Sequence, residues 1–214
     1  GWQYGLGISV DGDGNAVIVG NFQDSLTLDG TTLVSAGLFD IFIAKLDTTG
    51  NVVWAKGYGG TSSDSAEDVV LDNTGDIIVT GNFSSPQVTF DSTTLHCTGA
   101  QELFVVRLGA NGTVQWARGS TGGDVSSSQA RAAGITADAA RDIYVTGEIA
   151  GPDVNWGGTV LSGSSGSDVF VTKLHSDGQV VWVRTFGQGS GDFDDDGGRA
   201  ITVDASGDSY LTGY

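Results

Sequence analysis

Short apolar runs and short polar turns alternate along the whole sequence. Within the runs, apolar residues fall at every second position, as Phe42, Ala44 and Leu46 illustrate. That spacing is the period of a β-strand, and no segment sustains the 3.6-residue period of an amphipathic helix. The turns combine Asp, Asn, Ser or Thr with a Gly, which supplies the positive φ that tight hairpins need. The pattern predicts a nearly all-β chain made of hairpins.

The hairpins form an internal repeat. One block reads VDGDGNAVIVGNF at 10–22 and LDNTGDIIVTGNF at 71–83, and two further copies follow it. The Gly that closes this block recurs at Gly20, Gly81, Gly147 and Gly213. The spacing predicts three full units of about 61–66 residues and a partial fourth. These units are about 10–70, 71–136 and 137–202, with the fragment at 203–214.

Two further blocks complete each unit. The longer one reads DIFIAKLDTTGNVVWAK at 40–56 and recurs at 102–118 and 168–184. A weaker one precedes it, with LTLDGTTLVS at 26–35 as its first copy. Four strands and one extra short hairpin suit a β-propeller blade that is longer than the minimal blade of about 40–45 residues. We therefore predict that 1–214 forms one β-propeller segment. The alternatives are a stacked β-solenoid and a string of small sandwiches.

These blocks resemble the bacterial seven-bladed β-propeller repeat family. Its units read D-x-x-G-N/D-x-Y-V-T-G and then D-x-F-V-x-K-L-D-x-x-G-x-x-x-W, and the likeness covers essentially the whole chain. Two departures are Ala139-Ala140-Arg141 in place of the turn Gly, and Gly109 where the first copy has Asp47. The resemblance implies an extracellular or surface-attached bacterial binding or scaffold module. The second block is also similar to the Trp-docking motif of quinoprotein propellers, with one residue fewer between its Asp and Gly.

If the resemblance holds, three units and a fragment do not close a ring of about six to eight blades. Open sheet edges invite further pairing. We therefore expect the ring to be completed by further segments of a longer polypeptide or by further copies of the chain. Residue 1 is not Met, so the N-terminus is expected to be processed, truncated or incompletely known.

Composition narrows the function classes. The 26 acidic and 9 basic residues give a formal net charge of -17, which repels phosphate backbones and argues against nucleic-acid binding. No apolar run approaches the roughly 18 residues of a membrane span, and this stretch shows no signal peptide. An acidic, turn-rich chain with one Cys is typical of secreted and surface proteins. We therefore expect an extracellular or cell-surface location.

Two acidic segments are candidate calcium sites. The first is the group Asp192, Asp194, Asp195 and Asp196, whose carboxylates repel one another unless a cation or solvent screens them. The second is the turn with Asp11 and Asp13, whose oxygen donors are two residues apart, although it lacks the later Glu of an EF-hand. The alternative for both segments is a solvated acidic loop. Calcium is the only cofactor that the sequence suggests.

One Trp recurs in every unit, at Trp54, Trp116 and Trp182. Repetition at the period of the fold favours a structural role, in which each indole packs one sheet on the next, over a platform for a sugar or cofactor. The copies differ most at 57–68, 119–134 and 185–199. Variable loops on a rigid scaffold are where binding residues concentrate.

The function that these features favour is a binding or scaffold module that displays variable loops to a protein or glycan, supported by calcium. No catalytic residue is predicted. One alternative is a structural protein that self-assembles into a surface layer or filament. Another is a propeller enzyme, either a hydrolase or a quinoprotein-like dehydrogenase, although no nucleophile elbow, P-loop, zinc or dinucleotide motif is present.

Overall fold

The computed structural model describes residues 1–122, 128–163, 166–187 and 196–214. Within these ranges the chain contains twenty β-strands and no helix. All pairings between the named strands are antiparallel. A search of the same residues finds no helix that could span a membrane. The prediction of an all-β chain is confirmed.

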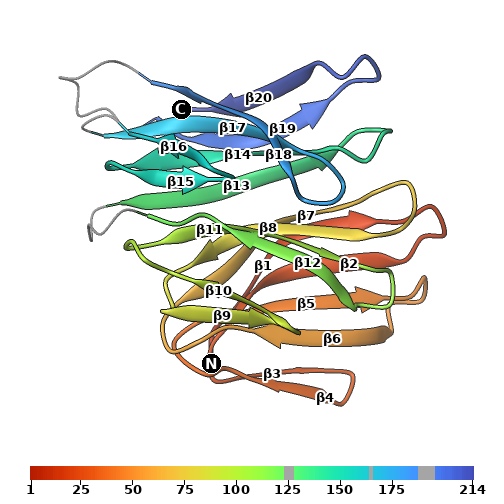
Figure 1. Ribbon diagram of the computed structural model, residues 1–214. Helices are drawn as coiled ribbons and strands as arrows, with labels where there is room; N and C mark the ends of the chain where they lie inside the picture. Colours follow the sequence, from red (N-terminus) through yellow and green to blue (C-terminus); the bar gives the residue numbers. More distant parts are fainter. Residues whose placement is uncertain (123–127, 164–165, 188–195) are drawn as a thin grey trace.

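Three four-stranded sheets and one two-stranded sheet follow one another along the chain (Figure 1). The first blade pairs β1 (Gln3–Val10), β2 (Ala16–Phe22), β5 (Asp40–Leu46) and β6 (Val52–Tyr58). The second pairs β7 (Asp64–Leu71), β8 (Ile77–Phe83), β11 (Glu102–Leu108) and β12 (Val114–Gly119). The third pairs β13 (Gln129–Ala137), β14 (Ile143–Ala150), β17 (Ser167–Leu174) and β18 (Val180–Phe186). The fourth consists of β19 (Gly198–Val203) and β20 (Ser209–Gly213).

A two-stranded hairpin is inserted between the second and third strands of each complete blade. These hairpins pair β3 (Ser25–Leu28) with β4 (Thr31–Val34), β9 (Gln87–Phe90) with β10 (Thr93–His96), and β15 (Val154–Trp156) with β16 (Thr159–Leu161). They correspond to the weaker block of the repeat. The blade is thus an antiparallel meander with one excursion.

The first strands of successive blades lie side by side, and the sheets stack face to face (Figure 1). This arrangement is that of consecutive propeller blades. Each first strand carries a β-bulge opposite the Gly that closes the first block. At Gly147 an added Cβ would lie 1.9 Å from the Arg131 carbonyl oxygen, and Gly20 and Gly81 are equally crowded. The repeated Gly is therefore required by the close approach of two strands.

Apolar side chains fill the space between neighbouring sheets. Val17 and Ile43 of the first blade pack into one cluster with Val69 and Phe104 of the second. On the opposite face of the second blade, Ile78 joins a cluster formed mainly by the third blade. The middle blade is buried on both faces, so its central strands β8 and β11 carry apolar residues at consecutive positions.

The blades have two different ends. The end that we call the turn end carries the tight turns at 11–15, 47–51, 72–76, 109–113, 138–142, 175–179 and 204–208. The opposite end, which we call the linker end, carries the segments that connect one blade to the next. All candidate sites lie at one of these two ends.

Candidate functional site

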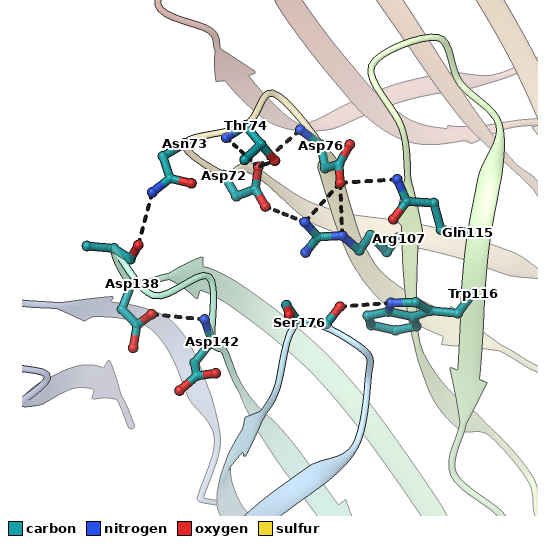
Figure 2. A network of polar contacts seen from close by, with 11 residues as sticks. Asp72, Asn73, Thr74, Asp76, Arg107, Gln115, Trp116, Asp138, Asp142 and Ser176 are labelled. Atoms are coloured by element: carbon teal, nitrogen blue, oxygen red, sulfur yellow. Dashed lines mark hydrogen bonds and ion pairs between the residues drawn. The ribbon is translucent and has the colours of Figure 1, made fainter.

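At the turn end, a Trp of one blade covers a turn Gly of the next. An added Cβ on Gly112 would lie 3.1 Å from ring atoms of Trp54, and one on Gly178 would lie 3.1 Å from ring atoms of Trp116. The Trp116 indole also donates a hydrogen bond to the Ser176 carbonyl at 3.0 Å (Figure 2). Trp182 packs edge-on against Tyr144, with 6.3 Å between ring centroids. The indoles of Trp54 and Trp116 therefore each pack one blade against the next.

The Asp that opens each first-block turn binds the backbone of its own turn. Asp11 accepts hydrogen bonds from the backbone N–H groups of Asp13 and Asn15, and from the Asn15 amide. The Asn15 amide is the main cause that lowers the Asp11 pKa. Lys45 lies 3.5 Å from the same carboxylate. Asp11 therefore already has internal partners for its charge.

The calcium candidates remain predictions. Asp192, Asp194 and Asp195 lie outside the described residues, whereas Asp196 donates its backbone N–H to the Ser167 carbonyl at 2.9 Å. Asp13 is exposed. Within the described part of the chain, no group of three or more His, Cys, Asp or Glu residues is placed to hold a metal ion.

A buried ion-pair network lies at the turn end of the second blade (Figure 2). Arg107, only 2% exposed, binds the carboxylates of Asp72 and Asp76, the latter through Nη2 at 3.0 Å and Nε at 3.2 Å. Burial acts to raise the Asp72 pKa, but hydrogen bonds from Thr74 and Arg107 outweigh it, so the pKa is lowered. Gln115 donates to Asp76 at 3.1 Å. The network holds the charges of this turn in a fixed arrangement.

At the linker end, a pocket of about 280 Å³ opens between the second, third and fourth blades. Its polar side chains form one chain of contacts. Arg199 donates to the Tyr214 hydroxyl at 2.9 Å, which lies 3.4 Å from Glu148. Glu148 in turn lies 3.4 Å from Arg131, which also binds Gln101. The pocket thus combines guanidinium, carboxylate, amide and phenol groups.

Positions that are equivalent in the repeat carry different residue types in this pocket. Asn82 donates to the Ala132 carbonyl at 3.2 Å and accepts from its N–H at 2.7 Å, so it pins the third blade to the second. The same position of the next blade is Glu148, which contacts side chains instead. Glu67 and Arg199 both lie at the bulge of a first strand and line the pocket. Ligand-specific residues would be expected where copies diverge in this way.

The sequence analysis did not identify a set of buried carboxylates at the linker end. Asp40 and Glu102 are the first residues of the third strand of their blades, Asp168 is the second residue of that strand in the third blade, and all three are buried. Asp40 accepts a hydrogen bond from the Ala36 N–H at 2.7 Å, and burial raises its pKa to about 6. The signal was present, because an acidic residue opens each of three apolar runs at the same place. Asp40 and Glu102 accept hydrogen bonds from backbone N–H groups of adjoining loops.

No protein-family model matches the chain. A protein of Acanthamoeba polyphaga mimivirus, described as an uncharacterized WD repeat-containing protein, is 25% identical over 219 residues. That match covers 86% of this chain but only 16% of the viral protein, so the chain spans a small part of its relative. Since WD repeats form propeller blades, this distant likeness agrees with the propeller-type repeat that the sheets show.

A solved structure of a protein of unknown function from Bacteroides caccae is 12% identical, with a TM-score of 0.28. The match covers 86% of this chain and 68% of that one. A likeness this low carries no argument about fold or function.

Proposed function

We propose that this protein is an extracellular or cell-surface β-propeller module that binds a glycan through its linker end. The observation that carries the proposal is the polar pocket formed by three blades, at positions where the copies of the repeat differ. Hydroxyl-rich ligands are recognised by a few well-placed polar groups in a concave site. Arg131, Glu148, Gln101 and Tyr214 present both donors and acceptors to such a ligand.

The experiment is binding of the purified protein to a printed array of neutral and acidic oligosaccharides. The variant Arg131→Gln removes one guanidinium from the pocket and is expected to lose the array signal. Arg184→Gln is the matched control, because Arg184 is exposed and does not line the pocket. Equal signals from the two variants, or none from the native protein, would refute glycan binding at this pocket.

The proposal includes a calcium ion that is bound by the segment with Asp192, Asp194, Asp195 and Asp196. What supports this role is the sequence, since several carboxylates so close together repel one another without a cation. The ion would screen these carboxylates rather than take part in chemistry. Its test is the melting temperature of the native protein with calcium and with a chelator.

A second candidate function is self-assembly, and a specific observation favours it. Ile8 on β1 is 67% exposed, whereas its counterparts Val69, Ile135 and Ile201 are only 4%, 5% and 9% exposed because a preceding blade covers them. On β20, Tyr210 is 58% exposed at the position of buried Ile78. Apolar faces of this kind mark interaction surfaces, and either a second copy or further blades of a longer polypeptide would cover them.

In a self-assembling protein, β20 of one copy would cover β1 of the next. Native mass spectrometry of the 214-residue chain would then show discrete multiples. The substitution Ile8→Asp is expected to abolish them. Val160→Asp is the control, since Val160 is 57% exposed on the inserted hairpin of the third blade. A single-chain mass for the native protein at all concentrations would exclude this function.

A further inference from the structure

The turn end holds a second pocket, separate from the one at the linker end. It is a shallow hollow of about 310 Å³ between the second and third blades. Arg107, Arg141, Trp116 and the turn at Ser176 supply its walls, together with Asp76, Gln115 and Asp177. Two of the nine basic residues of a strongly acidic chain therefore meet here.

Arg107 has unused hydrogen-bonding capacity at this pocket. Its Nε and Nη2 bind Asp72 and Asp76, but its Nη1 is buried and has no partner among the described residues. In Figure 2 this nitrogen lies away from the two carboxylates, on the side of the turn that carries Ser176. An unpaired donor on a buried cation is costly, so its persistence calls for an explanation.

The other copies of the repeat show that the guanidinium is not needed for the ion pair. Lys45 occupies the equivalent position in the first blade and pairs with Asp11. Lys173 does so in the third blade, at 2.8 Å from Asp142 and 3.7 Å from Asp138. The ion pair can therefore be made with an ammonium group. Among the three complete blades only the second has an Arg at this position, and its Nη1 is buried without a partner among the described residues.

Arg141 is the second unusual feature of the pocket. It occupies a turn position that Gly14, Gly75 and Gly207 hold in the other copies, with φ of 88°, 80° and 87°. Arg141 adopts the same left-handed conformation with φ of 70°, which is strained for a residue with a side chain. Strain of this kind is retained at binding sites. No ion pair of Arg141 is present among the described residues.

We infer that this pocket binds the carboxylate group of a small ligand, with Arg107 Nη1 and the Arg141 guanidinium as its donors. Guanidinium groups match the planar carboxylate in geometry. Asp76 and Asp177 lie in the same walls, so a multiply charged phosphate or sulfate would meet more repulsion than a single negative charge. The site is distinct from the glycan pocket of the proposed function and does not depend on it.

The test compares melting temperatures of the whole chain in sodium acetate, sodium phosphate and sodium chloride at equal ionic strength and neutral pH. Acetate is expected to raise the melting temperature of the native protein above that in chloride, because a ligand that binds only the folded state stabilises it. Phosphate also stabilises folded proteins in general, so its effect is compared between the native protein and the variants that lack a donor. Loss of one charge-assisted hydrogen bond should weaken acetate binding about tenfold.

Two variants identify the donors. Arg107→Lys keeps the buried ion pair, as in the other blades, and is expected to lose most of the acetate response. Arg141→Gly restores the turn of the other copies, so it should melt at a higher temperature in chloride and yet also lose the acetate response. Arg184→Lys, outside the pocket, should respond as the native protein does.

Three results would overturn the inference. The first is a native protein that melts at the same temperature in acetate and chloride. The second is a phosphate stabilisation that exceeds that of acetate in the native protein and is lost in both Arg107→Lys and Arg141→Gly. The third is an acetate response that survives in both Arg107→Lys and Arg141→Gly. Because Arg141→Gly is expected to be folded and stable, a loss of its response cannot be attributed to unfolding.

Discussion

Trp116 of the second blade covers Gly178 in a turn of the third and donates its indole N–H to the neighbouring Ser176 carbonyl at 3.0 Å. Trp54 and Gly112 repeat this relationship between the first and second blades. The turn Gly thus has two duties. It adopts a left-handed backbone conformation, and it leaves room for the indole of the preceding blade.

The substitution Gly178→Ala separates these two duties when it is compared with Gly50→Ala. Gly50 has the same positive φ but no atom within 4 Å of an added Cβ. It should lose only about 1 kcal/mol, from backbone strain. Gly178→Ala should lose a further ~1–3 kcal/mol by overpacking, because its added Cβ would lie 3.1 Å from ring atoms of Trp116 and 2.9 Å from Arg118 Nε. Urea unfolding measures both losses, and equal losses would show that the turn at Gly178 has room for a Cβ beneath Trp116.

Removal of the buried guanidinium should be far more damaging than its replacement by an ammonium. Arg107→Ala leaves Asp72 buried without its cation and is expected to cost about 3–5 kcal/mol. Arg107→Lys should cost much less, because Lys45 and Lys173 hold the same position in the other blades. The measurement is the free energy of unfolding in urea. A similar loss for both variants would contradict this account of the network.

Asp40 should make the protein less stable as the pH rises. Burial raises its pKa in the folded state to about 6, above the ordinary value of 3.8. Between these values the folded state holds a proton that the unfolded state has released, so the free energy of unfolding falls with rising pH. Asp40→Asn should make this slope smaller between about pH 4 and 6, while Asp68, whose pKa burial also raises, still contributes to it. Unfolding in urea across that range tests it.

Asp47 supplies the control of opposite sign. Hydrogen bonds from Thr49 and Asn51 lower its pKa to about 2. Its contribution to stability is therefore complete above the ordinary pKa of 3.8 and is lost as the pH falls toward 2. Asp47→Asn should leave the slope between pH 4 and 6 unchanged. If Asp47→Asn changed the pH dependence of the free energy of unfolding in this range, that dependence could not be assigned to Asp40 alone.

Calcium should raise the melting temperature of the native protein, and a chelator should reverse the effect, because an ion that binds only the folded state stabilises it. A variant with Asp192, Asp194 and Asp195 changed to Asn should lose this response. Asp11→Asn and Asp13→Asn test the second candidate turn separately. An unchanged melting temperature at saturating calcium would exclude a structural ion at either place.

The repeat, the strands and their turns could be predicted from the sequence because they depend on local chemistry. Alternation of apolar residues such as Phe42 and Ala44 sets the faces of a strand, and a turn Gly such as Gly112 sets the hairpin. Repetition of these signals at one period then implied blades. The recurrence of Trp54 and Trp116 likewise pointed to packing before their partners were known.

Only the tertiary structure showed which residues meet across the blades. Arg107 and Arg141 belong to different blades and line one pocket, and Arg131 and Tyr214 are far apart in sequence but share another. No local pattern encodes such pairs, since they depend on how each sheet stacks on the next. The burial that raises the Asp40 pKa has the same origin. Local sequence thus determined the blades, whereas the packing between blades decided the candidate sites.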